Sequence, residues 1–372
     1  MEHLVKMEGV EKRFHSKTNQ DITILREIDL IMEAGETLCV VGESGCGKTT
    51  LGRILAGLIP YSAGSYQFLG KEVATQHGKA EAQFRKSVQL IHQNPYESLN
   101  PTSMVYDTIA NPIRRHGTIK KADELYHEVS RLLELVGLTP VDDFVDKFPA
   151  QLSGGQRQRV SIARAFAMNP KFIVVDEATS MIDTSLRISL LATLKEIQDR
   201  TGVSYFFITH DLALGRYFAQ GQKMMVMYLG KIIEKAQTED FIRRPAHPYS
   251  KAILSAAQGS SDLLESSGEF EHYTLSGVDI PSFTAVPPGC SLHPRCPQAM
   301  PGLCERIIPG LIQLEPDHTV TCHLYNPAVK EQKAAGKDPG DLSEDIIKAG
   351  EVATRTTRPL VESSREKIDP IK

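Results

Sequence analysis

One short run of residues, from Gly42 to Thr49, has the composition and spacing of a phosphate-binding loop. It fits the pattern Gly-x-x-x-x-Gly-Lys-Thr, and it lies between an apolar burst at 37–41 and apolar residues at helical spacing. Glycines let backbone N–H groups converge on phosphate oxygens at a helix N-terminus, a lysine adds positive charge, and a threonine hydroxyl can bind Mg²⁺. A glycine-rich turn with a surface lysine is the alternative, which does not explain the flanking strand and helix. The predicted phosphate and Mg²⁺ contacts are Gly42, Glu43, Ser44, Gly45, Cys46, Gly47, Lys48, Thr49 and Thr50.

Two acidic residues and a histidine stand at the ends of further apolar bursts. Asp176 and Glu177 follow the apolar residues 172–175, and His210 ends the run 205–210. A carboxylate at the tip of a buried strand can hold the Mg²⁺ shell, and the next carboxylate can orient or deprotonate attacking water. We assign these roles to Asp176 and Glu177, and we expect His210 to reach the γ-phosphate or the water. Alone, each group would more often be a solvated acid or a structural histidine.

The elements that must position these residues alternate along the chain from about Leu4 to Ala257. Short unalternated apolar bursts at 37–41, 172–175 and 205–208 predict strands covered on both faces. Apolar residues at 51–58 and 125–136 recur with helical spacing. This order predicts an α/β core with a parallel sheet and crossover helices. Residues 84–151 lack a strong buried-strand burst, so we expect a mostly helical subdomain there.

Composition narrows the class of protein. The chain has 372 residues, of which 41% are hydrophobic and 24% charged, and this excludes a wholly disordered or fibrous protein. The formal net charge of −4 offers no global positive field for nucleic acid. The N-terminus lacks the apolar core of a secretory signal, and no apolar run approaches the roughly 18 residues that a membrane span needs. We therefore expect a cytosolic protein that reaches a membrane only through partners.

Residues Leu152 to Arg159, with the order Leu-Ser-Gly-Gly-Gln-Arg-Gln-Arg, resemble the signature of the ATP-binding cassette (ABC) ATPases. The resemblance covers roughly residues 4–257 and implies a P-loop NTPase cassette, with a RecA-like core and antiparallel β and helical subdomains, that binds and hydrolyses ATP with Mg²⁺. It also implies that two cassettes pack head to tail, so that Ser153, Gly154, Gly155, Gln156 and Asp183 contact the ATP bound by the opposite subunit. Helix N-termini suit this role because their N–H groups stabilise anionic charge.

The same resemblance implies roles for two more residues. Gln93 fits the glutamine that senses Mg²⁺ and the membrane partner, and Phe14 fits the aromatic residue that stacks on adenine. Lys48, Glu177 and His210 then form the catalytic group. Two departures are visible: residues 180–182 are Ser-Met-Ile where the family more often has Ser-Ala-Leu, and Phe14 replaces the commoner tyrosine. Both substitutions keep apolar or aromatic character, although Phe14 could instead be a core residue.

Two further runs, at 93–101 and 244–249, resemble the oligopeptide/dipeptide and nickel importer branch of this family. That branch implies two membrane permease subunits, a second ATPase subunit that is a paralogue or a copy, and indirectly an extracytoplasmic substrate-binding protein, with no nucleic acid. The expected location is the cytoplasmic face of the cell membrane. The leading hypothesis is an energy-coupling subunit for peptide import. Import of nickel chelates or oligosaccharides, an accessory that binds ATP without turnover, and a soluble ABC switch on nucleic acid or ribosomes are the alternatives.

Four of the six cysteines, Cys290, Cys296, Cys304 and Cys322, crowd into a proline-rich segment with the spacing C-x5-C-x7-C-x17-C. Four thiolates in a segment with little apolar material predict a metal-stapled appendage, since structural disulfides are rare in the cytosol. Both Zn²⁺ and an iron–sulfur cluster accept four cysteines. Similarity to the C-terminal extension of peptide-importer ATPases implies a [4Fe–4S] cluster, which we favour over Zn²⁺, and four free thiols or two disulfides are the minor alternative. We expect neither Cys39 nor Cys46 to be a ligand.

These patterns predict four parts of the chain. Residues 1–257 form the ATPase domain, with the helical subdomain at 84–151, and residues 258–281 form a small, polar linker. Residues 282–326 form the Cys-rich C-terminal domain. The Lys-, Glu-, Asp- and Ser-rich residues 327–372 are expected to be a flexible tail.

Overall fold

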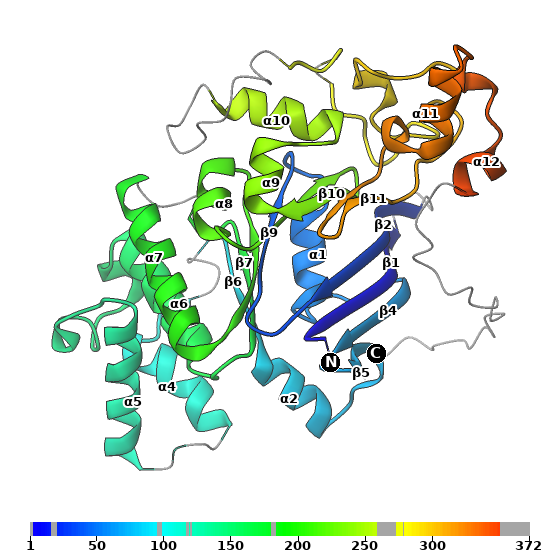
Figure 1. Ribbon diagram of the computed structural model, residues 1–372. Coiled ribbons are helices and arrows are strands. Elements are labelled where there is room, and N and C mark those ends of the chain that lie inside the picture. The colour runs from blue at the N-terminus through cyan, green and yellow to red at the C-terminus, as the bar shows by residue number, and fades with distance from the viewer. Residues whose placement is uncertain are drawn as a thin grey trace.

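The computed structural model describes residues 3–15, 21–94, 99–116, 119, 121–179, 184–258, 273–277 and 279–349. Two sheets organise them (Figure 1): one of eight strands in the order β11-β12-β10-β9-β3-β8-β7-β6, and one of four in the order β2-β1-β4-β5. The large sheet consists of β6 (Val88–Ile91), β7 (Phe172–Asp176), β8 (Ser204–Ile208), β3 (Thr37–Val41), β9 (Lys223–Tyr228), β10 (Lys231–Gln237), β12 (His318–Val320) and β11 (Ile312–Glu315). The small sheet consists of β1 (Val5–His15), β2 (Asp21–Met32), β4 (Ala63–Phe68) and β5 (Lys71–Glu72).

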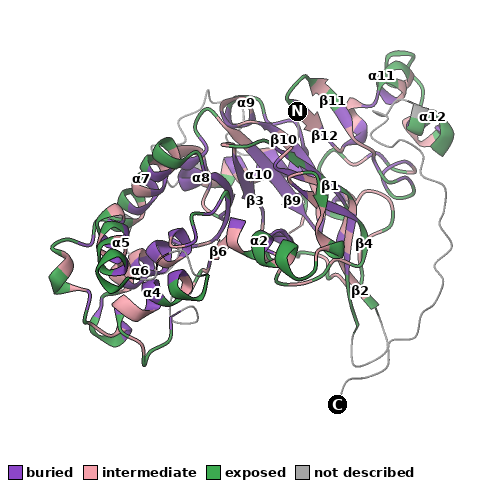
Figure 2. Ribbon diagram, turned by 90° about the horizontal axis from the view of Figure 1, so that it is seen from below, coloured by how far each residue is buried: buried purple, intermediate pink, exposed green. Residues whose placement is uncertain are grey.

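The central strands of the large sheet are parallel and covered on both faces. Every residue of β3, β7 and β8 is buried, and Figure 2 shows β3 in purple. Burial on both faces explains why the sequences of these strands do not alternate. Along β3, Cys39 and Val41 belong to one apolar core, while Leu38 and Val40 belong to the core on the opposite face. The strands predicted at 37–41, 172–175 and 205–208 are therefore confirmed to within one residue at each end.

Helices and the small sheet form the two covering layers. Helix α1 (Lys48–Leu55) shares one core with the buried residues of β1, β2 and β4, whereas α4 (Val105–Arg115), α5 (Ala122–Leu135), α6 (Gly154–Phe166) and α8 (Leu212–Phe218) contribute to the other. The remaining helices are α2 (Lys79–Ser87), α7 (Thr184–Thr201), α9 (Thr238–Arg243), α10 (Pro248–Gln258), α11 (Pro327–Ala334) and α12 (Glu344–Ala349). The helices expected at 51–58 and 125–136 appear as α1 and α5.

The expected helical subdomain at 84–151 needs one correction. Residues 88–91 form strand β6, which pairs in parallel with β7 at the edge of the large sheet. Gln89 and Leu90 are only partly buried, because an edge strand has a neighbour on one side only, and this interrupts the apolar signal. The helices of this segment, α4 and α5, begin after the strand and pack together with α6.

The prediction of a flexible tail at 327–372 is wrong for residues 327–349. Val329, Leu342 and Ile347 are buried in a small apolar cluster with Met300, Leu303, Cys304 and Ile307. This cluster gives the Cys-rich segment an apolar core that its own composition did not reveal. Of the predicted linker 258–281, residues 259–272 and 278 lie outside the described residues, and Ser276 N–H donates to the carbonyl of Arg295 at 2.8 Å.

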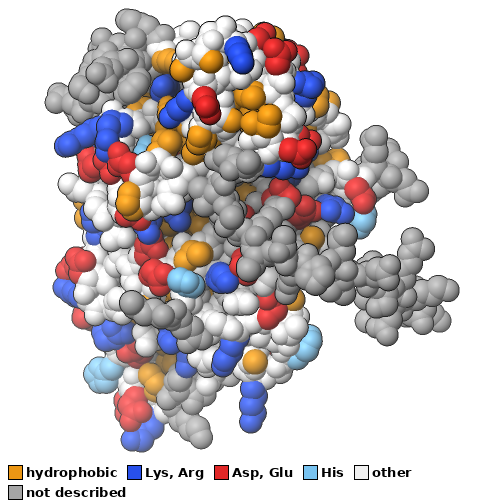
Figure 3. Space-filling model, turned by 45° about the vertical axis from the view of Figure 1, so that its right-hand side comes forward, with side chains coloured by type: hydrophobic (Ala, Val, Ile, Leu, Met, Phe, Trp, Pro, Cys, Tyr) orange, Lys and Arg blue, Asp and Glu red, His pale blue; other side chains and the backbone are white. Residues whose placement is uncertain are grey.

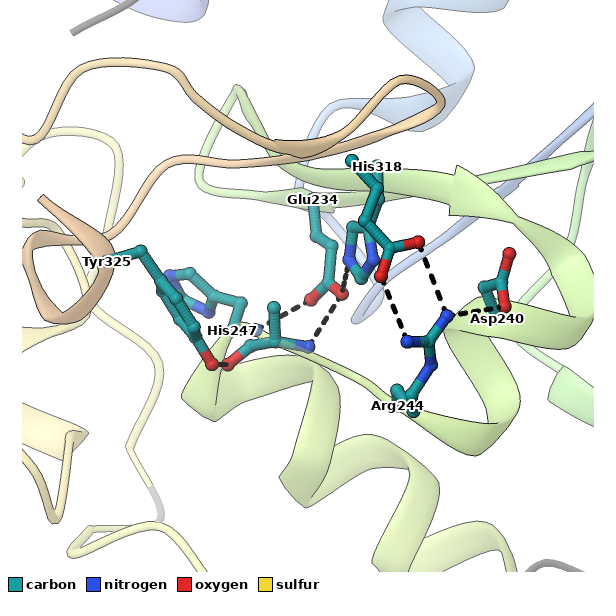
Figure 4. A network of polar contacts seen from close by, with 8 residues as sticks. Glu234, Asp240, Arg244, His247, His318 and Tyr325 are labelled. Carbon is teal, nitrogen blue, oxygen red and sulfur yellow. Dashed lines mark hydrogen bonds and ion pairs between the residues drawn. The ribbon is translucent and has the colours of Figure 1, made fainter.

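A buried carboxylate fastens the C-terminal extension to the strands and helices of residues 1–257 (Figure 4). Glu234, on β10, accepts the backbone N–H groups of Ala246 and His247, each at 2.7 Å, and a 2.8 Å hydrogen bond from His318 Nε2 on β12. Tyr325 Oη donates to the carbonyl of Ala246 at 2.9 Å. The Glu234 side chain is fully buried, so these donors replace its lost hydration. An exposed pair, Arg244 with Glu315, crosses the same junction.

The surface carries both charge signs close together. On the face drawn in Figure 3, acidic and basic side chains are interspersed over the molecule. Among the described residues, none of the helices combines the length and the apolar character required to cross a bilayer.

Replacing Glu234 by alanine is expected to lower the free energy of unfolding by about 3–5 kcal/mol, because His318 and two buried N–H groups lose their acceptor. Glu315→Ala is the matched control: it removes the exposed pair with Arg244 across the same junction, and it should cost less than about 1 kcal/mol. Denaturant unfolding of the full chain measures both. Equal losses for the two variants would contradict the role given to Glu234.

Candidate nucleotide site

The phosphate loop lies between the end of β3 and the start of α1, as the sequence pattern predicts. Helix α1 begins at Lys48, and its N-cap is Gly47, which has a φ of 109° that side-chain-bearing residues rarely adopt. At Gly42 an added Cβ atom would lie 2.3 Å from the carbonyl oxygen of Met227, so only glycine fits there. With glycine as N-cap, no side chain covers the first amides of the helix, which therefore face an incoming anion.

Lys48 braces the loop from within, and Thr49 links it to the end of β7. The Lys48 side chain is buried and its Nζ donates to the carbonyls of Gly42 at 2.8 Å and Glu43 at 3.1 Å. Thr49 Oγ1 donates to Asp176 Oδ1 at 3.1 Å. Burial raises the pKa of Asp176, and the hydrogen bond from Thr49 opposes that rise. A hydroxyl and a carboxylate oxygen at this spacing form a donor set that suits Mg²⁺.

Glu177 lies one residue beyond Asp176, where the backbone leaves the sheet. Its φ of 46° is in the left-handed region, and its N–H donates to the carbonyl of Ile208 at 3.0 Å. Two groups predicted from sequence meet its Oε2 atom: Gln93 Nε2 at 3.1 Å and His210 Nδ1 at 3.2 Å. The structure therefore brings Gln93, Glu177 and His210 together from three separate strand ends. A carboxylate oriented in this way can accept a proton from water.

Four of the five predicted trans-contact residues, Ser153 to Gln156, lie apart from the phosphate loop (Figure 1), at the start of α6. Ser153 is the N-cap: its Oγ accepts the N–H of Gln156 at 3.2 Å, and Gln156 Oε1 accepts the N–H of Ser153 at 2.9 Å. Ser153, Gly155 and Gln156 line a hollow with Arg159, Leu186 and Leu190, and none of the phosphate-loop residues lines it. Asp183 and residues 180–182 lie outside the described residues.

Phe14 lies on β1 with 42% of its surface exposed, so it is not a core residue. Lys12 Nζ lies 4.8 Å from the centroid of its ring. An exposed aromatic ring is available for stacking, which is the role that the resemblance implies.

The structure adds a contact that the sequence did not predict: the C-terminal extension reaches the phosphate loop. Arg295 Nη1 and Nη2 each lie 3.1 Å from a carboxylate oxygen of Glu43, and Nη1 also donates to Tyr228 Oη at 3.3 Å. The N–H of Glu43 donates to Tyr249 Oη at 2.8 Å. The hydrogen bonds to Glu43 raise the pKa of the Arg295 guanidinium. No local pattern connects residues 252 positions apart, so sequence reasoning had no signal for this pair.

The four clustered cysteines also converge. All six cysteines are free thiols, and Cys290, Cys296, Cys304 and Cys322 line one cavity together with His247, His293 and His323. Cys39, within β3, and Cys46, in the phosphate loop, do not line it. The described residues contain no group of three or more His, Cys, Asp or Glu side chains that could hold a metal ion in this arrangement.

The N–H of Met300 donates to Cys304 Sγ at 3.4 Å. For Cys290, Cys296 and Cys322, the amide two residues further along lowers the pKa of the thiol. Burial raises the pKa of all four thiols, that of Cys290 to about 12, and these amides act against the rise. Amides directed at sulfur are what a set of thiolate ligands requires.

Known families match two parts of the chain. The ABC transporter family matches residues 25–180, and a family described as the C-terminal region of oligopeptide/dipeptide transporters matches residues 233–304. The oligopeptide transport ATP-binding protein AppF of Bacillus subtilis is 34% identical over 334 residues, which are 87% of this chain and 98% of AppF. The dipeptide transport ATP-binding protein DppF of Haemophilus influenzae is 38% identical over 319 residues, which are 86% of this chain and 94% of DppF.

Solved structures match the fold. The cassette cbiO1 of Clostridium perfringens superposes with a TM-score of 0.56 at 24% identity, covering 64% of this chain and 90% of that one. The dimeric cassette MJ0796 with bound ADP and phosphate gives 0.57 at 24% identity, covering 63% and 98%. The core is thus a P-loop ABC cassette. The chain belongs to the ABC transporter ATP-binding proteins, in the branch that carries the oligopeptide/dipeptide C-terminal region.

Replacing Glu177 by glutamine is expected to leave ATP affinity within about threefold of wild type and to lower steady-state phosphate release by about 100-fold or more, since an amide cannot accept the proton of the attacking water. Glu196→Gln, which removes an exposed glutamate paired with Arg200 on α7, is the matched control and should change neither quantity. Nucleotide titration and phosphate release measure the two effects. Unchanged turnover would remove Glu177 from this role.

Proposed function

We propose that this chain is the ATP-hydrolysing, energy-coupling subunit of an importer for di- or oligopeptides, held at the cytoplasmic face of the cell membrane by two permease subunits and paired with a second cassette. A single observation carries the proposal: one chain joins an assembled nucleotide site to the C-terminal region that distinguishes oligopeptide/dipeptide transporters. The extracytoplasmic substrate-binding protein would act on it only indirectly, through the permeases.

The residues of the nucleotide site would have two kinds of role in hydrolysis: some bind ATP and Mg²⁺, and others take part in proton transfer. Lys48 and the first amides of α1 would hold the β- and γ-phosphates, Thr49, Gln93 and Asp176 would hold Mg²⁺, and Phe14 would stack on adenine. Glu177 would accept a proton from the water whose oxygen attacks the γ-phosphorus. The bond from that phosphorus to the β–γ bridging oxygen then breaks, giving ADP and phosphate. His210, within hydrogen-bond reach of Glu177, would orient the carboxylate and contact the γ-phosphate.

The remaining contacts would come from the second cassette. The partner subunit's Ser153 and the following amides of its α6 would meet the γ-phosphate, because the helix N-terminus favours negative charge. Ser153 already caps its own helix, and its hydroxyl proton stays available for such a donation. The contact of Asp183 with the ATP of the opposite subunit stays a prediction.

The cysteine cavity would hold a [4Fe–4S] cluster, with Zn²⁺ as the alternative. Support comes from the four sulfur atoms that line one cavity, and from the N–H of Met300, which donates to Cys304 Sγ. A group bound there would join three apolar clusters, since Cys290 and Cys296 pack on the main core while Cys304 and Cys322 belong to two smaller clusters. Its role would be to fasten the extension.

Anaerobic purification followed by iron, sulfide and zinc analysis tests the metal group. We expect about four irons and four sulfides per chain and absorbance in the visible range. Cys304→Ser should lose most of this content, whereas Cys39→Ser, at a buried cysteine away from the cavity, should retain it. One zinc per chain without iron would overturn the cluster in favour of Zn²⁺, and absence of both would overturn the metal site.

Capture of permeases from membranes tests the transport role. A hollow of about 810 Å³ beside α4, lined by residues that include Gln89, Ser103 and Asn111, has room for a cytoplasmic helix of a permease. Asn111→Trp should fill it and lower recovery of hydrophobic subunits about tenfold. His127→Trp, on the exposed side of α5, should not, and both variants should bind ATP like wild type. Retention of the permeases by Asn111→Trp would exclude this hollow as their docking site.

A further inference from the structure

We propose that Arg295 is a positioning residue of the nucleotide site: it neutralises the carboxylate that the phosphate loop itself carries, and it makes ATP affinity depend on the cysteine cavity. The first part depends only on the ABC cassette and its phosphate loop. The second part rests on the proposed metal group in that cavity.

The phosphate loop contains a charge of the wrong sign for its ligand. Glu43 lies between Gly42 and Ser44, and its own carbonyl accepts a hydrogen bond from Lys48 Nζ. The Glu43 side chain is only 27% exposed, so water screens its charge poorly. A bound triphosphate adds several negative charges to the same loop, and an uncompensated carboxylate would therefore repel it.

Arg295 is built to remove this repulsion. Its side chain is 7% exposed, and its two terminal nitrogens each meet one oxygen of Glu43 at 3.1 Å, which is the bidentate geometry that guanidinium and carboxylate prefer. Arg295 Nε donates to the carbonyl of Gly277 at 3.2 Å, and Tyr228 Oη accepts from Nη1. These contacts fix the guanidinium plane, so the carboxylate is held toward the extension.

The turn that carries Arg295 also joins two cysteines of the cavity. It spans residues 293–295: His293 N–H donates to the carbonyl of Cys290 at 2.9 Å, and Cys296 N–H donates to the carbonyl of His293 at 3.3 Å. Cys290 N–H in turn donates to the carbonyl of Cys304 at 2.8 Å. Loss of order in the cavity would thus release the turn, and with it the charge partner of Glu43.

A different explanation is that Arg295 only fastens the extension to the cassette. That role would lower thermal stability when Arg295 is replaced, but it would not depend on the charge of Glu43. Electrostatic neutralisation makes the opposite prediction: removing the charge of Glu43 should cancel the effect of removing Arg295 on ATP affinity. A comparison of single and double variants separates the two explanations.

The test measures the ATP dissociation constant of the full chain. Arg295→Gln should weaken ATP binding about tenfold, the size expected for one unneutralised charge in a poorly screened site. Arg295→Lys, which keeps the charge but loses the bidentate geometry, should weaken ATP binding less than Arg295→Gln does. The double variant Arg295→Gln/Glu43→Gln should stay within about threefold of wild type. Arg244→Gln is the matched control, because it removes an arginine–carboxylate pair across the same junction, and it should leave ATP affinity unchanged.

Two results would overturn the positioning role: wild-type affinity for Arg295→Gln, or a double variant that binds ATP as weakly as Arg295→Gln does. For the link to the cavity, Cys296→Ser in the full chain should weaken ATP binding like Arg295→Gln, and adding Glu43→Gln should restore it. Wild-type ATP affinity in Cys296→Ser, or no restoration, would overturn that link. Metal analysis of the wild-type chain tests the proposed metal group separately. The comparison of the Arg295 and Glu43 variants stays valid whatever that analysis shows.

Discussion

Parallel strands present their carboxyl ends at one edge of a sheet, and this constraint assembles the nucleotide site. Strands β3, β7 and β8 run side by side, so the loops that follow Val41, Asp176 and Ile208 must open at the same edge. Thr49 therefore meets Asp176, and Glu177 meets His210, although long stretches of chain separate them. The left-handed backbone at Glu177 belongs to the same geometry, because the chain must turn sharply to direct a carboxylate out of a buried strand.

A second constraint is electrostatic. A loop that binds phosphate must keep its own negative charge away from the ligand, and this loop contains Glu43. The partner of that carboxylate comes from the C-terminal extension, through Arg295. The tyrosine of the run at 244–249, Tyr249, approaches the same residue through the N–H of Glu43. The extension therefore contacts the phosphate loop through Arg295 as well as enclosing the cysteines.

Most of the cassette could be predicted because its signals are local. Strands buried on both faces give unbroken apolar bursts, and a phosphate loop needs glycines at set positions whatever surrounds it. Strand β6 was not predicted because two of its four residues are only partly buried, so its sequence lacks an unbroken apolar run. Val329, Leu342 and Ile347 were not predicted as core because they are scattered through a stretch rich in polar and charged residues, and only tertiary packing gathers them. The Arg295 and Glu43 pair lies beyond any local pattern, since neither residue is unusual in its own neighbourhood.

Strands β11 and β12 have a consequence for how separable the extension is. β12 pairs with β10 through Glu234 and Lys235, so the outer edge of the cassette sheet is closed by backbone from the far end of the chain. A cassette ending after α10 would leave the N–H and C=O groups of that edge without strand partners, and exposed edges invite pairing between molecules. The extension thus moves the free edge of the sheet from β10 to the shorter strand β11, and a chain that has been synthesised only as far as α10 leaves the edge of β10 open until β12 arrives.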